Sequence, residues 1–177
     1  SYFHDVIKPD DINIIDFLSG ILTNAEAMAK KYEVKFYSDK GGETVVNLMI
    51  DANRLGLAIS NLVDNAIKYN VKNGSVTVKL ERLPDKPYLQ ISIKDTGIGI
   101  PPEDMPKLFT RFFRTENAAK MEIEGSGLGL YIAKNIINRH GGTIWAESIL
   151  GRGTTVYFTL PIDPKLIPQK EAPASSE

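Results

Sequence analysis

Cysteine is absent from this chain of 177 residues, and histidine occurs only twice. Without cysteine the chain has no disulfide, thiolate zinc site or cysteine nucleophile, and two isolated histidines cannot build a multi-histidine metal site. A surplus of charge is missing too, because 21 basic and 22 acidic side chains leave a net charge of −1. We therefore expect no nucleic acid partner, and a polyanionic ligand would need local positive groups or a metal ion.

Long apolar runs are also missing. No stretch approaches the roughly 18 apolar residues of a membrane span, and residues 1–10 do not resemble a signal peptide. We expect a cytoplasmic segment without membrane contact of its own. The length suits one domain, placed at residues 1–161, followed by a disordered tail at 162–177. Because the first residue is Ser1 and not Met, we expect a piece of a longer protein.

Apolar residues at helical spacing predict three helices. The first spans residues 11–32 and begins at Asp10 or Asp11, the second follows a cap at Asp51 and stops before Asn73, and the third spans 128–139. His140 ends the third helix, where we interpret it as a cationic cap. Alternating residues predict strands at 2–7, 33–38, 44–50, 75–82, 88–94, 143–148 and 154–160. We expect one hairpin from the strands at 33–38 and 44–50, and another from those at 75–82 and 88–94.

Glycines gather at three places in the chain: after Asp95, before the third helix, and in a tight loop at 151–153. Glycine lets backbone N–H groups approach phosphate oxygens, and a following helix adds unpaired donors and a favourable dipole. The cluster at 125–129 fits neither the dinucleotide fingerprint nor the P-loop. Taken singly, a glycine is more often a turn or a cap than a ligand contact, and the alternative for Asp95 is the cap of a turn after a strand.

The predicted second helix carries polar residues beside its apolar stripe. Asn61, Asn65 and Lys68 share one face, and Tyr69 follows. An amide oxygen is a hard ligand suited to Mg²⁺, and the ion keeps water and substrate phosphates as its other ligands. A lysine would bind the negatively charged phosphates. The alternative is a polar face that contacts only water.

Five motifs in order resemble the catalytic ATP-binding domain of sensor histidine kinases, a branch of the GHKL superfamily. They are similar to the N-box, the first glycine box, the phenylalanine box, the second glycine box and the closing glycine-threonine motif, at residues 61–69, 95–100, 108–114, 125–130 and 151–155. The resemblance implies an α+β Bergerat-type fold, in which a mixed five-stranded sheet packs on three helices. It also makes residues 101–124, which lack a regular period, a mobile ATP lid.

The resemblance further implies a role for individual residues. Asp95 would accept a hydrogen bond from the adenine amino group, helped through water by Thr154, and Asn65 would hold Mg²⁺. Asn61, Lys68 and Arg114 would be catalytic, with Arg114 ordering the γ-phosphate. Phe109, Phe112 and Phe113 would anchor the lid, unless they serve core packing alone. The complete predicted nucleotide site is Asn61, Asn65, Lys68, Tyr69, Asp95, Gly97, Gly99, Ile100, Phe109, Arg114, Gly125, Ser126, Gly127, Leu128, Gly129, Leu130 and Thr154.

One position separates a kinase from a hydrolase in this superfamily. Related ATPases place a general-base glutamate where this chain has Asn61, and a neutral amide cannot abstract a proton from water. The resemblance therefore implies transfer of the γ-phosphoryl group of Mg-ATP to a histidine, with slow hydrolysis. The alternatives are a nucleotide-binding regulatory module and an ATPase of the same fold.

The phosphoacceptor histidine is expected outside this chain. His4 stands in a stretch similar to a phosphoacceptor box, but Ile7 departs from the pattern and no helical hairpin fits between His4 and Asn61. The resemblance implies two partners, namely a dimerisation domain that carries the acceptor histidine in the same parent protein, and a response regulator receiver domain. It implies a monomer for the isolated domain and a homodimeric, commonly membrane-anchored parent.

Overall fold

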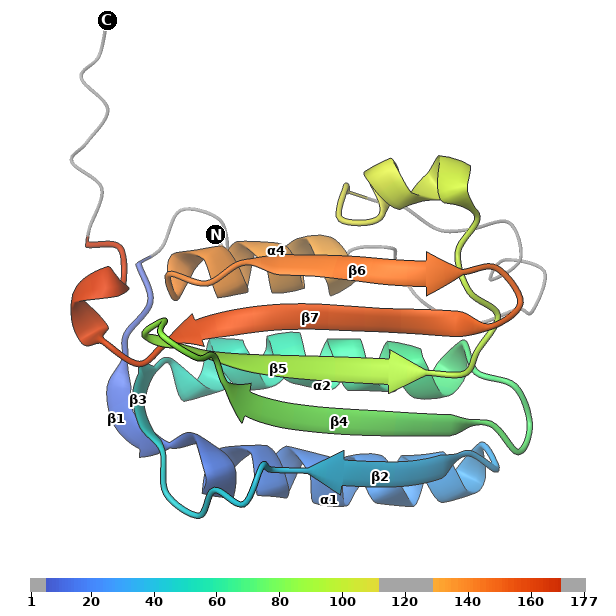
Figure 1. Cartoon of the computed structure of the whole chain (residues 1–177), viewed down its shortest axis with the longest axis horizontal. Helices are drawn as coiled ribbons and strands as arrows, with labels where there is room; N and C mark the ends of the chain where they lie inside the picture. The colour runs from blue at the N-terminus through green and yellow to red at the C-terminus, as the bar shows by residue number, and fades with distance from the viewer. Residues whose placement is uncertain (1–5, 112–128, 170–177) are drawn as a thin grey trace, which may run out of the picture.

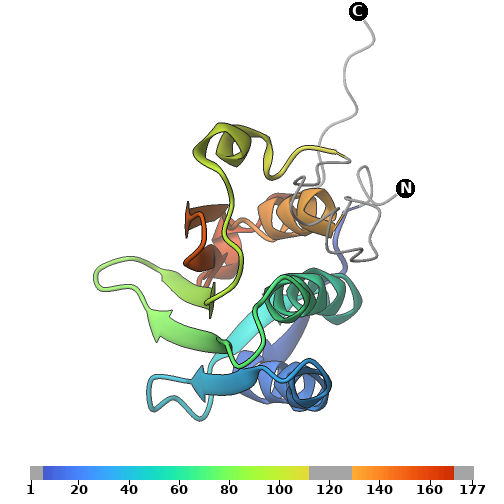
Figure 2. The ribbon, with the colours of Figure 1, turned by 90° about the vertical axis from the view of Figure 1, so that its right-hand side faces the viewer.

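The computed structural model describes residues 6–111 and 129–169. A five-stranded sheet has the order β2-β4-β5-β7-β6, in which β2 and β4 are parallel and the other pairs are antiparallel. Helices α1, α2 and α4 all lie on one face of this sheet (Figures 1 and 2). The predicted mixed sheet packed on helices is confirmed. The bounds of the sheet and helices are β2 Lys35–Asp39, β4 Ser75–Arg82, β5 Tyr88–Asp95, β6 Ile144–Ile149, β7 Gly153–Pro161, α1 Ile14–Lys31, α2 Ala52–Lys68 and α4 Gly129–Arg139.

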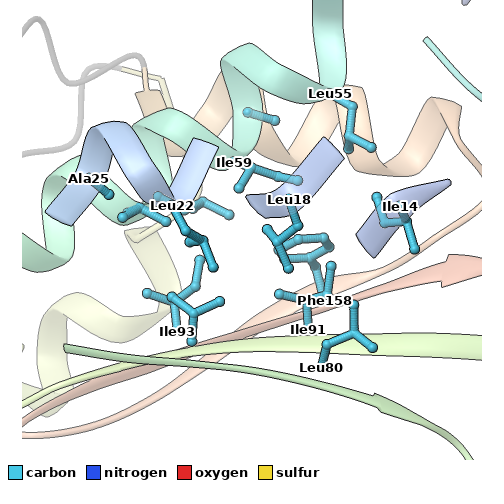
Figure 3. Packing of buried hydrophobic residues seen from close by; sticks show 14 of the residues in the cluster. Ile14, Leu18, Leu22, Ala25, Leu55, Ile59, Leu80, Ile91, Ile93 and Phe158 are labelled. Atoms are coloured by element: carbon cyan, nitrogen blue, oxygen red, sulfur yellow. The ribbon is translucent and has the colours of Figure 1, made fainter. Parts of the chain in front are cut away.

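The hydrophobic core lies between the sheet and the helices (Figure 3). Helix α1 contributes apolar side chains three or four residues apart, and the strands contribute alternate residues, so each element buries one face. Phe158 of β7 is fully buried beneath α1 and α2. The side chains labelled in the figure are Ile14, Leu18, Leu22, Ala25, Leu55, Ile59, Leu80, Ile91, Ile93 and Phe158.

The start of the domain differs from the prediction. Residues 10–13 form strand β1 (Asp10–Asn13), which pairs antiparallel with β3 (Asn47–Ile50). The predicted strand at 2–7 is wrong for residues 6 and 7, which form no strand, and residues 2–5 lie outside the described part. Asn13 caps α1, because its side-chain oxygen accepts from the Ile15 N–H at 3.1 Å. Asp10 and Asp11 are paired in β1 and therefore do not start the helix.

The predicted hairpin of residues 33–38 and 44–50 is wrong. Strand β2 pairs in parallel with β4, and β3 leaves the main sheet to pair with β1. Both segments alternate as strands should, but alternation does not specify a partner strand. The partner is decided by burial, since Leu48 and Ile50 of β3 enter the core.

Helix α2 begins after its predicted cap at Asp51 but ends at Lys68, several residues earlier than expected. Asn70 stops it. The side chain of Asn70 is 6% exposed, accepts from the Val71 N–H at 2.8 Å and donates to the Ser75 carbonyl at 2.9 Å. These bonds replace the helical hydrogen bonds of this turn and tie the end of α2 to β4.

The chain after β7 is partly folded. Residues Pro164–Leu166 form the 3-10 helix η2, and Ile167 is only 8% exposed. The prediction of a disordered tail is therefore wrong for residues 162–169, where the chain forms a short helix and buries Ile167. Residues 170–177 lie outside the described part. Across the described ranges no helix is long and apolar enough to cross a membrane.

Gly20 offers a test of helix stability. It lies exposed in the middle of α1, where a β-carbon would meet no atom within 4 Å. Gly20→Ala should therefore raise the free energy of unfolding by about 1 kcal/mol, as glycine is a poor helix residue. Urea denaturation measures the change. Gly97→Ala is the control and should destabilise, because its β-carbon would collide with the Tyr69 carbonyl oxygen; equal effects of the two substitutions would contradict this account.

Candidate nucleotide-binding site

Several helix and strand ends lie at one end of the molecule, on the right in Figure 1. Helix α2 and strand β5 end there, while β7 and α4 begin there. The N-terminus of α4 brings backbone N–H donors and a positive dipole end to this place. The predicted site residues of α2, β5 and β7 thus belong to elements that end or begin at the same end of the sheet.

Asp95, the last residue of β5, is fixed through one of its two carboxylate oxygens. Its Oδ1 accepts from the Gly97 N–H at 2.9 Å and from the Thr154 N–H at 3.1 Å. Within the described residues, Oδ2 has no hydrogen bond. Burial raises the pKa of Asp95 to about 6, against the opposing effect of these two N–H groups. At neutral pH this carboxylate is ionised and can only accept, so Oδ2 suits a donor on a ligand.

The loop after Asp95 packs closely against its neighbours. The Ile98 N–H donates to the Tyr69 carbonyl at 3.1 Å, and Gly97 lies so close to that carbonyl that no β-carbon fits. Gly99 has a φ of 71°, and a β-carbon at this position would collide with the Ile149 carbonyl. Both glycines are thus required by the fold of the loop, and their contact with a ligand stays a prediction.

Ser148 of β6 joins this loop to the start of β7. Its Oγ accepts from the Ile100 N–H at 2.8 Å, donates to the Gly153 carbonyl at 2.9 Å and bonds the Thr154 hydroxyl at 2.8 Å. Sequence reasoning did not find Ser148. The signal that could have found it is the strand register, which places Ser148 directly opposite Thr154.

The polar face of α2 is built as predicted. Asn61, Asn65 and Lys68 are half-buried, while the opposite stripe of the helix enters the core. Among described residues, none forms a hydrogen bond to the side-chain amide of Asn61 or Asn65. The neighbouring Asp64 has a raised pKa because it is partly desolvated, an effect that Lys68 opposes. The two amides and the ammonium group can therefore serve a ligand without breaking bonds in the described chain.

A metal ion here would need oxygens from its substrate. In the described part of the chain, no three histidine, aspartate or glutamate side chains are grouped as a metal site. The amide oxygen of Asn65 is a suitable single ligand for Mg²⁺, which commonly keeps water and phosphate oxygens as its other ligands. The residues thus fit Mg²⁺ carried in with a phosphate group, and do not form a complete protein cage.

Sequence comparisons with known proteins agree on one family. Residues 50–164 match the sequence profile described as "Histidine kinase-, DNA gyrase B-, and HSP90-like ATPase". The chain belongs to this ATPase family. It is 41% identical over 150 residues to the sensor histidine kinase WalK of Bacillus subtilis, and 34% identical over 159 residues to the sensor protein kinase WalK of Staphylococcus aureus. These matches cover 85% and 90% of this chain but only 24% and 38% of the relatives, so the chain spans well under half of either protein.

Solved structures of this ATPase family agree with the fold. The catalytic domain of histidine kinase ThkA aligns with a TM-score of 0.76 at 27% identity, over 90% of this chain and 99% of ThkA's. The mycobacterial sensor histidine kinase MprB aligns with a TM-score of 0.73 at 28% identity, over 87% of this chain and 97% of MprB's. ThkA is also known in complex with a response regulator protein, TrrA.

Several predicted contacts of the ATPase site lie outside the described residues: Arg114, Gly125, Ser126, Gly127, Leu128, and the aromatic residues Phe112 and Phe113. Gly129 begins α4, and Leu130 packs half-buried on the core. Phe109 is half-buried beyond the 3-10 helix η1 (Pro102–Lys107) of the predicted lid. Sequence reasoning missed one contact here: the Arg111 guanidinium lies over the Tyr131 ring of α4, 5.2 Å from its centroid.

His140 connects the far ends of α2 and α4, the two helices that border the site. Its Nε2 accepts from the Asp51 N–H at 3.0 Å, so Nδ1 carries the proton and donates to the Ile136 carbonyl at 2.9 Å. The side chain is 1% exposed, and burial lowers its pKa. The predicted cationic cap is therefore wrong in charge: His140 caps α4 as a neutral imidazole, because a buried cation is costly.

Proposed function

We propose that this chain is the ATP-binding catalytic domain of a sensor histidine kinase and transfers the γ-phosphoryl group of Mg-ATP to a histidine on a separate dimerisation domain. One observation carries the proposal: the half-buried Asp95 carboxylate keeps one oxygen without a hydrogen bond among the described residues, at the end of the sheet where α2 also ends. An acceptor-only oxygen selects the amino group of adenine. Membership in an ATPase family supports the same nucleotide.

The residues of α2 have distinct proposed tasks. Asn65 would hold Mg²⁺ through its amide oxygen, and the ion would supply charge neutralisation for the phosphates. Lys68 would bind a phosphate oxygen, and Tyr69 would line the ribose side. Asn61 would orient the phosphate chain without activating water, since a neutral amide is no base. Such an arrangement favours transfer to an external nucleophile, in which positioning and electrostatic stabilisation supply most of the catalysis.

The proposed partners follow from the reaction. The acceptor is a histidine of a dimerisation domain in the same parent protein, and the phosphoryl group then passes to a response regulator aspartate. The ThkA–TrrA complex supports the second partner, since that histidine kinase binds a response regulator. In the parent we place this domain as one unit of a homodimer, with Arg114 and the backbone of residues 125–129 completing the phosphate site.

The experiment combines binding with transfer in trans. The chain is titrated with Mg-ATP by calorimetry and then incubated with γ-labelled ATP and a separately expressed dimerisation domain from a WalK-type relative. Binding followed by acid-labile, base-stable label on the acceptor is the expected result. Binding without label on the acceptor would favour a regulatory module and end the kinase proposal.

Asn61→Glu tests the alternative of an ATPase. The substitution supplies a carboxylate base at the position where hydrolases of this superfamily have one, so hydrolysis by the isolated chain should rise about tenfold or more from a slow basal rate. A coupled assay of ADP release measures it. Asn61→Gln is the control, because it keeps the amide and should not raise the rate. Rapid hydrolysis by the unmodified chain would contradict the role given to Asn61.

A further inference from the structure

A hydroxyl pair at the β6–β7 junction has a fixed direction of hydrogen bonding. Ser148 Oγ has one proton and two acceptor positions. Its proton goes to the Gly153 carbonyl, which can only accept, and one acceptor position takes the Ile100 N–H. The remaining contact, to Thr154 Oγ1 at 2.8 Å, must then be donated by Thr154. Ser148 thereby uses its full bonding capacity inside the protein.

The consequence falls on Thr154. Since its only hydroxyl proton is given to Ser148, Thr154 Oγ1 has lone pairs but no donor left for a ligand or a bridging water. The Thr154 N–H holds Asp95 Oδ1 at 3.1 Å, so the hydroxyl and the carboxylate belong to one connected unit. Asp95 Oδ2 is likewise an acceptor. The unit therefore offers a ligand two acceptors, Asp95 Oδ2 and Thr154 Oγ1.

We propose that Ser148 is a positioning residue that determines specificity, an inference that rests on the proposed nucleotide site. Ser148 holds the Thr154 hydroxyl as an acceptor, and the site therefore selects a 6-amino purine over a 6-oxo purine. A 6-amino group donates to such acceptors directly or through water. A 6-oxo group presents an acceptor to acceptors and is rejected, since buried polar groups would then be left unpaired. Ser148 also fixes the loop after Asp95 through the Ile100 N–H.

The same two strands provide a matched control at their other end. Thr159 Oγ1 accepts from the Thr143 N–H at 3.0 Å and bonds the Thr143 hydroxyl at 3.2 Å. It thus copies the bonds of Ser148, a backbone N–H and a threonine hydroxyl, far along β7 from Asp95. Thr159→Val should cost stability without changing the choice of base.

The test compares the affinities for Mg-ATP and Mg-ITP, which differ at the 6-position, by calorimetry of the whole chain at pH 8. Ser148→Ala frees the Thr154 proton to rotate toward the ligand. We expect the ATP-to-ITP preference to fall about tenfold, as suits one hydrogen bond. Thr159→Val should leave the preference unchanged, and Ser148→Thr, which keeps a hydroxyl, should restore most of it. Thr154→Val should lower the preference as well, and the double variant with Ser148→Ala should lower it no further.

The outcomes separate the two proposals. If the unmodified chain binds no ATP, the nucleotide function itself fails. If the unmodified chain prefers ATP, and both Ser148→Ala and Thr159→Val lower the affinities for ATP and ITP equally, Ser148 has only a structural role. That result overturns the inference, while the proposed nucleotide function stands. An unchanged preference in Ser148→Ala overturns it too. Should Ser148→Ala fail to fold by circular dichroism, Thr154→Val decides: a retained preference for ATP counts against the inference.

Discussion

Asp95→Asn is expected to weaken the binding of Mg-ATP about 100-fold and to leave the fold intact. The asparagine oxygen can still accept from the Gly97 and Thr154 N–H groups, so the turn is kept. Its amide nitrogen, in place of Oδ2, presents a donor to the adenine amino group. The loss of a charge-assisted hydrogen bond and the new donor–donor contact together account for roughly 3 kcal/mol. Calorimetric titration measures the affinity, and a change of less than fivefold would contradict adenine recognition by Asp95.

The pKa of Asp95, raised to about 6, gives the same residue a signature in pH. In the proposed site ATP binding needs the ionised carboxylate, so the affinity for ATP should decline by about tenfold per pH unit as the pH falls below 6. Asp95→Asn has no such titration and serves as the reference for the protonation of ATP itself. Identical pH profiles of the two proteins would rule out Asp95 as the titrating group.

The same raised pKa affects stability with a definite sign. The folded protein binds the proton of Asp95 more tightly than the unfolded chain, so the ionised group opposes folding above pH 6, and this penalty is relieved as the pH falls through 6 toward 4. Asp95→Asn should consequently raise the melting temperature at pH 7. The shift corresponds to at most about 3 kcal/mol, or several degrees for a domain of this size.

His140→Ala is expected to lower the free energy of unfolding by about 3 kcal/mol, the largest loss that we expect from one site remote from the nucleotide. The substitution leaves a cavity in place of a side chain that is only 1% exposed, and it leaves the Asp51 N–H at the start of α2 without its acceptor. Chemical denaturation at pH 7.5 measures the loss. Asn138→Ala, at an exposed position on the same turn of α4, is the control and should cost less than 1 kcal/mol; equal losses would argue against a special role for His140.

Acid should reproduce part of this effect in the unmodified chain. The folded pKa of His140 lies below its ordinary value of 6.5, so its contribution to stability is complete above pH 6.5 and is lost as the pH falls from there toward the folded pKa. Protonated Nε2 cannot accept from the Asp51 N–H. Because Asp95 acts in the opposite sense between pH 6 and 4, the comparison is best made in the Asp95→Asn background. Unchanged stability between pH 7.5 and 5.5 in that variant would contradict the neutral assignment of His140.

The pKa shifts of Asp95 and His140 have one physical origin. Each side chain is desolvated between elements that meet only in the folded chain, and each accepts a hydrogen bond from a backbone N–H of a distant segment. His140 fixes the far ends of α2 and α4, and Asp95 fixes the start of β7 to the end of β5. The Asp95 end of the proposed site is therefore held together by contacts within the described chain.

Local sequence determined much of this protein. The alternation of residues 75–82 and 88–94 produced β4 and β5 within one residue of the prediction, and Asp51 capped α2 where expected, because these features depend on near neighbours. The spacing of Asn61, Asn65 and Lys68 likewise determined their shared face, since helical geometry alone places them together. The family resemblance rested on such short motifs, and the match of residues 50–164 confirms it.

Only the tertiary structure decided which distant segments meet. The parallel pairing of β2 with β4, and the bonds of Ser148 to Ile100 and Thr154, depend on strand order and register, which alternation cannot specify. The same holds for charge: the sequence placed a cation at His140 and could assign no pKa to Asp95, because desolvation is a property of the folded surroundings and not of the residue.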